Sequence, residues 1–98
     1  MNIYEIEEPE RGKETFLLLH QTPTLKIEAI RSRLSVAGVI YDQNEDEWVV
    51  LVRGSATMEI QGVKHALKEG DSVFLARHTR HQVLSTSDDA VWIGVFSF

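Results

Sequence analysis

A chain of 98 residues supplies one small domain, because a second hydrophobic core could not be built from so few side chains. A hydrophobic fraction of 43% and a charged fraction of 26% are those of an ordinary globular protein, and no apolar run approaches the ~20 residues of a membrane span. The net charge of -5 argues against nucleic-acid binding, and the absence of cysteine restricts any metal site to nitrogen and oxygen ligands. The acidic start of the chain does not resemble a secretion signal, so we expect a cytoplasmic protein.

The first forty residues carry the weakest structural pattern. Residues 16–19 are four adjacent apolar side chains, which fit either a strand or a short helix, so the secondary structure of residues 14–20 is left open. After the break at Pro23, residues 24–32 alternate apolar and charged side chains and predict a strand.

From Trp48 to the end, short apolar runs separated by Gly, Asp and Ser predict an all-β chain. Gln61 and Gly62 predict a tight hairpin turn, since glycine tolerates the positive φ that such turns require. The expected strands are residues 48–53, 56–60, 63–67, 72–75, 81–85 and 91–97. Antiparallel strands of this length and spacing favour a sandwich or a jelly-roll barrel, with residues 1–98 as a single domain and a barrel core of about 24–98.

The alternation of side chains along strands predicts that two polar residues point into the core. If residues 41–53 run extended, Glu47 shares a face with Val49 and Leu51 and points into the core. On a later strand His81 shares a face with Val83 and points the same way. A buried carboxylate destabilises the fold unless an imidazole, an arginine or a metal ion lies next to it and compensates its charge. We therefore expect Glu47 and His81 to meet near one mouth of the barrel.

The stretches around these two residues resemble the two cupin motifs. Where the first motif has His, His, Glu and Gly, this chain has Tyr41, Gln43, Glu47 and Gly54 at the same spacing. The second motif falls on a second set of positions, and its essential histidine is kept; the set is Gly70, Ala76, His78, His81 and Ser85. The likeness is to small single-domain bacterial cupins, and it covers residues 38–98 and, more faintly, 24–32.

The resemblance implies a double-stranded β-helix with a metal site at the barrel mouth. The implied ligands of that site are Tyr41, Gln43, Glu47 and His81. Imidazole, carboxylate and amide donors suit a divalent ion such as zinc, iron, manganese or nickel. Two histidines of the usual set are replaced, so a structural hydrogen-bonded Glu–His pair is the competing interpretation. His78 takes the place of a motif glycine, and whether it joins the ligands is open.

Several other polar and aromatic residues have simple structural explanations. The acidic residues near the first motif predict a solvated loop, and two nearby arginines either pair with that loop or orient an anionic substrate. The two remaining histidines are expected to be structural and the two tryptophans to be core or interface residues. These residues are Asp42, Glu45, Asp46, Arg77, Arg80, His20, His65, Trp48 and Trp92.

The sequence leaves the function open between two classes. One is a metal-dependent enzyme acting on a small polar molecule, and the other is a metal-free ligand-binding module or a structural dimer without catalysis. The last strand is apolar on both faces, with Trp92, Val95, Phe96 and Phe98, and a strand of that kind is covered on both sides. We therefore predict a homodimer to which this strand contributes.

Overall fold

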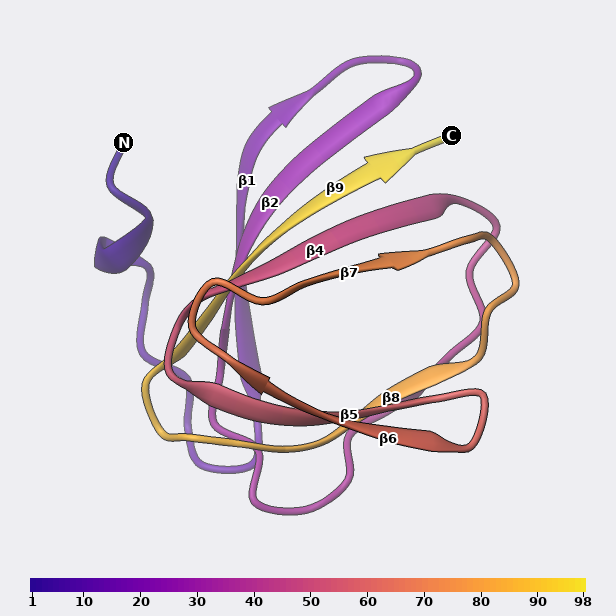
Figure 1. The fold of residues 1–98 in the computed structure, drawn as a ribbon. Helices are drawn as coiled ribbons and strands as arrows, with labels where there is room; N and C mark the ends of the chain where they lie inside the picture. Colours follow the sequence, from indigo (N-terminus) through magenta and orange to yellow (C-terminus); the bar gives the residue numbers. More distant parts are fainter.

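The computed structural model describes residues 1–98 and is an all-β fold of two facing sheets, as predicted. A five-stranded sheet has the order β1-β2-β9-β4-β7, and a four-stranded sheet has the order β3-β8-β5-β6. Figure 1 shows the first set fanning across the upper part of the molecule, with β8, β5 and β6 beneath it. The strands are β1 (Glu14–Gln21), β2 (Leu25–Ser32), β3 (Ile40–Tyr41), β4 (Asp46–Arg53), β5 (Ser55–Ile60), β6 (Val63–Lys68), β7 (Ser72–Leu75), β8 (His81–Thr86) and β9 (Ala90–Ser97).

The core lies between the two sheets and follows the alternation of side chains along each strand. On β4 the inward residues Val49 and Leu51 are buried, and on β9 the inward Trp92 is buried beside them. From the opposite sheet, Ala56 and Met58 of β5 complete the contact, as the sequence predicts. The full buried cluster is Val49, Leu51, Ala56, Met58, Leu75, Ala90 and Trp92.

Two turns show why glycine occupies particular positions. Gln61 and Gly62 both have positive φ, 48° and 81°, and Ile60 pairs with Val63 directly across them, which is the predicted two-residue hairpin. Gly54 has φ +85°, and a side chain there would collide with Ser87 and with the Asp89 carboxylate. The turn that returns β4 to β5 therefore requires glycine.

The segment that the sequence left open is a strand. β1 pairs antiparallel with β2, and a register shift between Leu18 and His20 interrupts the alternation of its side chains. That irregularity explains why the apolar residues of this strand do not alternate with polar ones in the sequence. Upstream lies a short 3-10 helix, η1 (Ile3–Glu5), with Ile6 buried next to it. The five-stranded sheet thus extends upstream to Glu14.

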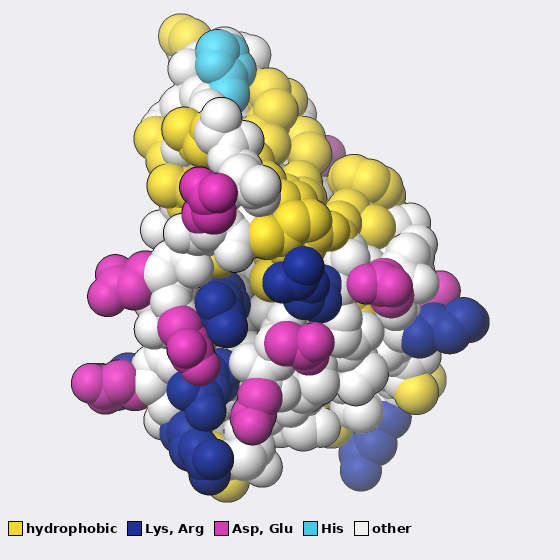
Figure 2. Space-filling model, turned by 90° about the vertical axis from the view of Figure 1, so that its left-hand side faces the viewer, with side chains coloured by type: hydrophobic (Ala, Val, Ile, Leu, Met, Phe, Trp, Pro, Cys, Tyr) yellow, Lys and Arg dark blue, Asp and Glu magenta, His cyan; other side chains and the backbone are white.

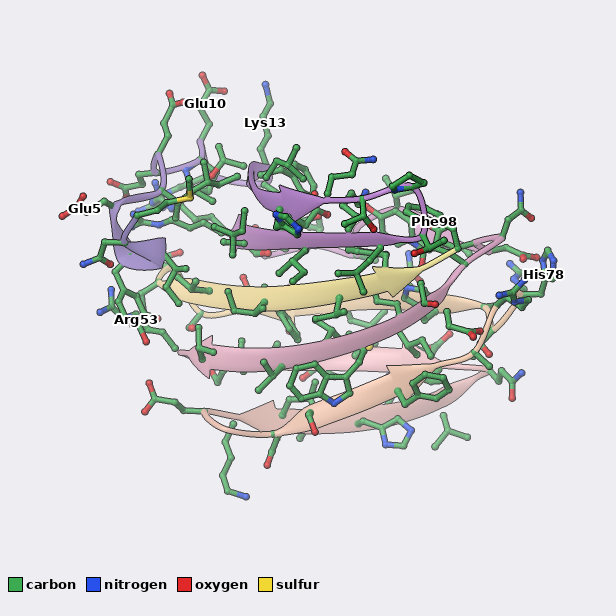
Figure 3. The ribbon with its side chains drawn as sticks, turned by 90° about the horizontal axis from the view of Figure 1, so that it is seen from above. Glu5, Glu10, Lys13, Arg53, His78 and Phe98 are labelled. Atoms are coloured by element: carbon green, nitrogen blue, oxygen red, sulfur yellow. The ribbon has the colours of Figure 1, made fainter.

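The N-terminal segment packs against one end of the barrel. Arg33 of the β2 end contacts the Glu8 carboxylate at 3.1 Å, and Arg53 lies 3.9 Å from the centre of the Tyr4 ring. Figure 3 shows Glu5 and Arg53 at this end, and His78 with the C-terminal Phe98 at the opposite end. Figure 2 shows interleaved acidic and basic side chains over the lower part of one face and apolar side chains gathered above them.

The expectation that residues 41–53 run as one extended segment is wrong. Tyr41 ends β3 in the four-stranded sheet, and β4 begins at Asp46 in the other sheet, so residues 42–45 carry the chain across. The opposite loop holds this crossing in place, since the His78 amide donates to the Gln43 carbonyl at 2.7 Å. The alternation of side chains therefore gives the correct direction for Glu47 within β4, but it cannot be extended to Tyr41, which lies on another strand.

No helix of the structure is long and apolar enough to cross a membrane.

Candidate functional site

A pocket lies between the inner faces of the two sheets, and its cavity volume is about 90 Å³. All four residues of the predicted site line this pocket. The other lining residues are carboxylates, aromatic rings and aliphatic side chains, and they come from seven strands. The lining residues are Glu14, Phe16, Glu28, Ile30, Tyr41, Gln43, Glu47, Val49, Met58, Leu75, His81, Val83, Trp92 and Phe96. The structure thus brings the two halves of the sequence signature into one cavity.

Glu47 is the buried acid of the pocket. It is only 6% exposed, and its carboxylate accepts no hydrogen bond from any group of the chain. The pKa of Glu47 is raised to about 7, first by burial and then by the neighbouring negative charges of Glu28 and Glu45, while Lys26 acts in the opposite direction. Near neutral pH the Glu47 side chain therefore exists both as a carboxylic acid and as a carboxylate.

Gly94 of β9 makes room for the Glu47 carboxylate. In the sheet Gly94 stands between Val49 of β4 and Glu28 of β2. A methyl group at this position would lie 3.0 Å from the Phe96 ring and 3.5 Å from Glu47 Oε2. The absence of a side chain at Gly94 thus leaves room for the Phe96 ring and the Glu47 carboxylate.

His81 faces Glu47 from the opposite sheet, with its side chain oriented by two contacts. It is 7% exposed, and its Nδ1 lies 2.9 Å from the Thr79 carbonyl oxygen, which can only accept, so Nδ1 carries the hydrogen. In the neutral imidazole Nε2 is then an unprotonated acceptor, 3.8 Å from Glu47 Oε1. The Tyr41 ring stacks on the imidazole with 5.5 Å between centroids, because Tyr41 and His81 pair across β3 and β8.

The donors present fit a resident metal ion poorly. No group of three His, Asp or Glu side chains in the structure is placed to hold one, whereas catalytic zinc-type sites use three strong protein ligands. Gln43 adds an amide to the pocket, but the Tyr41 hydroxyl is a weak substitute. Burial raises the pKa of Tyr41, with the charges of Glu14, Glu47 and Glu28 adding to the effect, and this disfavours the phenolate that would bind a cation.

Two further carboxylates line the pocket and were not anticipated from the sequence. Burial raises the pKa of Glu28 on β2, although the nearby Lys26 lowers it. On β1, Glu14 Oε2 accepts a hydrogen bond of 2.5 Å from Ser32 Oγ, which itself accepts from Trp92 Nε1 at 3.2 Å. The alternation in residues 24–32 separates Lys26 and Glu28 from the apolar face, but it gives no signal that the charged face turns inward.

His78 does not join the pocket. Its side chain is 62% exposed, and Nδ1 lies 2.9 Å from Asp42 Oδ1 in the neighbouring loop. Arg77 follows the same pattern, since its amide donates to Asp46 Oδ1 at 2.8 Å and its guanidinium lies 3.5 Å from the same oxygen. These contacts confirm the pairing of Arg77 with the acidic loop, while Arg80 lines a separate polar depression with Glu59.

The remaining aromatic and histidine predictions have mixed outcomes. Trp92 is a core residue, as predicted, whereas Trp48 lies on the outer face of β4 and is 42% exposed, so it is not part of the core. His20 and His65 are both exposed on their strands and lie outside the pocket.

Comparison with protein families gives one match, a cupin domain over residues 35–96, which is more than half of the chain. This range contains both motif stretches and most of the pocket lining. No match was found among curated proteins.

Solved structures share the fold over nearly the whole chain. A Ralstonia eutropha JMP134 protein, provisionally assigned as a mannose-6-phosphate isomerase, is 31% identical, with a TM-score of 0.85 over 99% of this chain and 95% of its own. KdgF from a Halomonas species is 23% identical, with a TM-score of 0.82 over 95% and 86% of the two chains. A cupin 2 conserved barrel domain protein from Salinispora arenicola CNS-205 is 17% identical, with a TM-score of 0.76 over 100% and 85%.

Proposed function

We propose that the pocket of this chain, which belongs to the cupin family, binds a small polar molecule without a resident metal ion. The observation that carries this proposal is Glu47, a buried carboxyl group with no hydrogen-bond partner, whose oxygen faces the cavity. A buried polar group without a partner in the chain costs stability, and a bound ligand can supply the missing partner.

Glu47 and His81 would form the polar end of the ligand-binding site. Their 3.8 Å separation is too long for a direct hydrogen bond, and a ligand hydroxyl or amine could contact both groups. Such a group could donate to Nε2 of a neutral His81, since the Thr79 carbonyl places the hydrogen of that tautomer on Nδ1. It could also contact Glu47, and Gln43 supplies both a donor and an acceptor to the same pocket.

A divalent metal ion is the second candidate occupant, and the orientation of His81 favours it. Metal-binding histidines commonly donate their other ring nitrogen to a carbonyl, as His81 does to Thr79. The ligands would be Tyr41, Gln43, Glu47 and His81, and zinc, iron, manganese or nickel would suit them. The shortage of strong donors places this candidate second.

A sugar phosphate, as the name of the Ralstonia eutropha neighbour suggests for that protein, fits this pocket poorly. Phosphate recognition relies on arginine, lysine or a helix N-terminus, and no arginine or lysine lines the cavity. Arg77, which the sequence offered as a group to orient an anionic substrate, is paired with Asp46.

Elemental analysis combined with thermal shift would separate the two candidates. We expect untagged protein to carry at most trace metal, and zinc, manganese, nickel or iron to leave the melting temperature unchanged. A Glu47→Gln variant should lose binding of small polar ligands and keep its fold. Stoichiometric metal in the wild type that disappears in His81→Gln would overturn the metal-free proposal.

We also propose that the protein forms a homodimer through the outer face of its five-stranded sheet. Trp48 and Phe74 pair across β4 and β7 on this face and are 42% and 64% exposed, with Val95 of β9 beside Trp48. Exposed aromatic side chains that adjoin in this way are typical of a protein interface. β9 lies in the middle of the sheet, so it would contribute its outer face and no free edge.

A further inference from the structure

We propose that the pocket selects organic cations, namely small molecules that carry an ammonium group on a compact apolar body, and rejects anionic ligands. This inference rests on the proposed ligand-binding function and names the chemical class of the ligand. Three features carry it: the charge of the lining, the unpartnered Glu47 and the aromatic walls.

The charge of the pocket lining is one-sided. Glu14, Glu28 and Glu47 all line the cavity from the same sheet, and no lysine or arginine lines it. The Lys26 amine lies 4.0 Å from a Glu28 oxygen, and one positive charge cannot offset three carboxylates. An anionic ligand would meet excess negative charge in a partly buried cavity, where repulsion is stronger than in bulk water.

Glu47 shows that the acidic lining is not satisfied within the chain. Glu14 has a hydrogen-bond donor in Ser32, and Glu28 lies near Lys26, but Glu47 has no hydrogen-bond donor and contacts only His81 Nε2, at 3.8 Å. It is more than nine-tenths buried and lines the cavity. A ligand cation placed near Glu47 would supply the partner that the protein lacks.

Aromatic rings supply the second type of contact for a cation. Phe16, Tyr41, Trp92 and Phe96 line the same cavity, and ring faces attract ammonium groups through their quadrupoles. The chain already contains one such contact, since the Lys26 amine lies 4.5 Å from the centre of the Phe96 ring. Carboxylates combined with aromatic walls are the surroundings that quaternary ammonium groups require.

The sheet brings two of the acids to one aromatic ring. Gly94 of β9 pairs with Glu28 of β2, and Phe96, two residues along β9, pairs with Glu47 of β4. The Phe96 ring lies over Gly94, since a methyl group at Gly94 would be 3.0 Å from this ring and 3.5 Å from Glu47 Oε2. A cation bound beside the Phe96 ring would therefore lie near the carboxylates of Glu47 and Glu28.

The test compares isosteres that differ in charge. Metal-free protein at about pH 8, where Glu47 is mostly ionised, is titrated with ammonium, tetramethylammonium and choline, and then with dimethylbutanol and dimethylbutanoate, the neutral and anionic analogues of choline. We expect at least one cation to bind about tenfold more tightly than dimethylbutanol, and dimethylbutanoate not to bind. Isothermal calorimetry gives the affinities.

The two tryptophans report where the probe binds. Trp92 lines the pocket and Trp48 lies on the outer face, so the indole nitrogen–proton signal of Trp92 should shift on titration while that of Trp48 stays in place. A Trp48→Phe variant assigns the two signals. A cation that shifts the indole signal of Trp48 and leaves that of Trp92 unchanged would show binding at the surface and overturn the inference.

A matched pair of variants tests the charge. Glu28→Gln, which lies outside the predicted metal-ligand set, should weaken cation binding about tenfold and leave dimethylbutanol binding unchanged. Glu69→Gln removes the same charge from an exposed turn and should change neither. Equal binding of choline and dimethylbutanol would overturn the cation inference and leave the ligand-binding proposal standing. If no cation binds, the inference fails, and if a divalent metal binds instead, the metal-free proposal fails with it.

Discussion

The Glu47 carboxyl group should make the stability of the protein depend on pH in a way that one substitution removes. In the folded chain the pKa of Glu47 is about 7, raised from 4.5 first by burial and then by neighbouring acids. The folded state therefore holds the proton more tightly than the unfolded state does. Stability from this group is present below about pH 4.5 and is lost as the pH rises through about 7.

The magnitude follows from the difference between the two pKa values. Each pKa unit corresponds to about 1.4 kcal/mol, so the shift from 4.5 to about 7 amounts to about 3 kcal/mol in the free energy of unfolding. Glu47 is almost fully buried, so solvent screens little of this effect. Glu47→Gln has a similar shape and does not titrate, and it should be more stable than the wild type at about pH 8 by this order of magnitude.

The assay is urea denaturation of both proteins at one protein concentration, from about pH 4 to about pH 9. The difference between wild type and Glu47→Gln isolates Glu47 from Glu28 and Tyr41, whose pKa values are also raised. Glu69→Gln is the matched control, and its difference from the wild type should be flat. A flat difference for Glu47→Gln as well would refute the assignment of Glu47 as a buried, unpaired acid.

Three further predictions follow from the geometry. Gly54→Ala should lower the free energy of unfolding by about 1–2 kcal/mol or more in urea titration, because its φ of +85° is costly for any residue with a side chain. Gly94→Ala should displace the Phe96 ring and weaken ligand binding by calorimetry, and unchanged affinity would contradict the role of Gly94 in placing that ring. Phe74→Glu should yield a monomer by light scattering while Glu69→Gln stays dimeric, and a monomeric wild type would remove the dimer proposal.

The sequence predicted those features that depend on neighbours along the chain. The hairpin at Gln61 and Gly62 needs only a two-residue turn between alternating strands, and the structure confirms it. The inward direction of Glu47 follows from its spacing to Val49 and Leu51 on one strand, and this too is confirmed. The motif glycine, Gly54, occupies the turn after β4, where any side chain at this position would collide with neighbouring residues.

The features that sequence reasoning missed depend on how the sheets close. Tyr41 lines the pocket, as the motif implies, but it does so from the opposite sheet, because the chain crosses between sheets after it and the alternation of side chains cannot be followed through such a crossing. Glu14 and Glu28 face inward because β1 and β2 extend the larger sheet over the cavity, a placement that no local pattern encodes.

Native mass spectrometry of the untagged protein tests the central claim most directly, because it weighs the folded chain together with whatever it holds. The account predicts protein with no bound metal ion, and a mass increase on addition of a small polar ligand that Glu47→Gln abolishes. One metal ion per chain in the wild type, lost in His81→Gln, would contradict it.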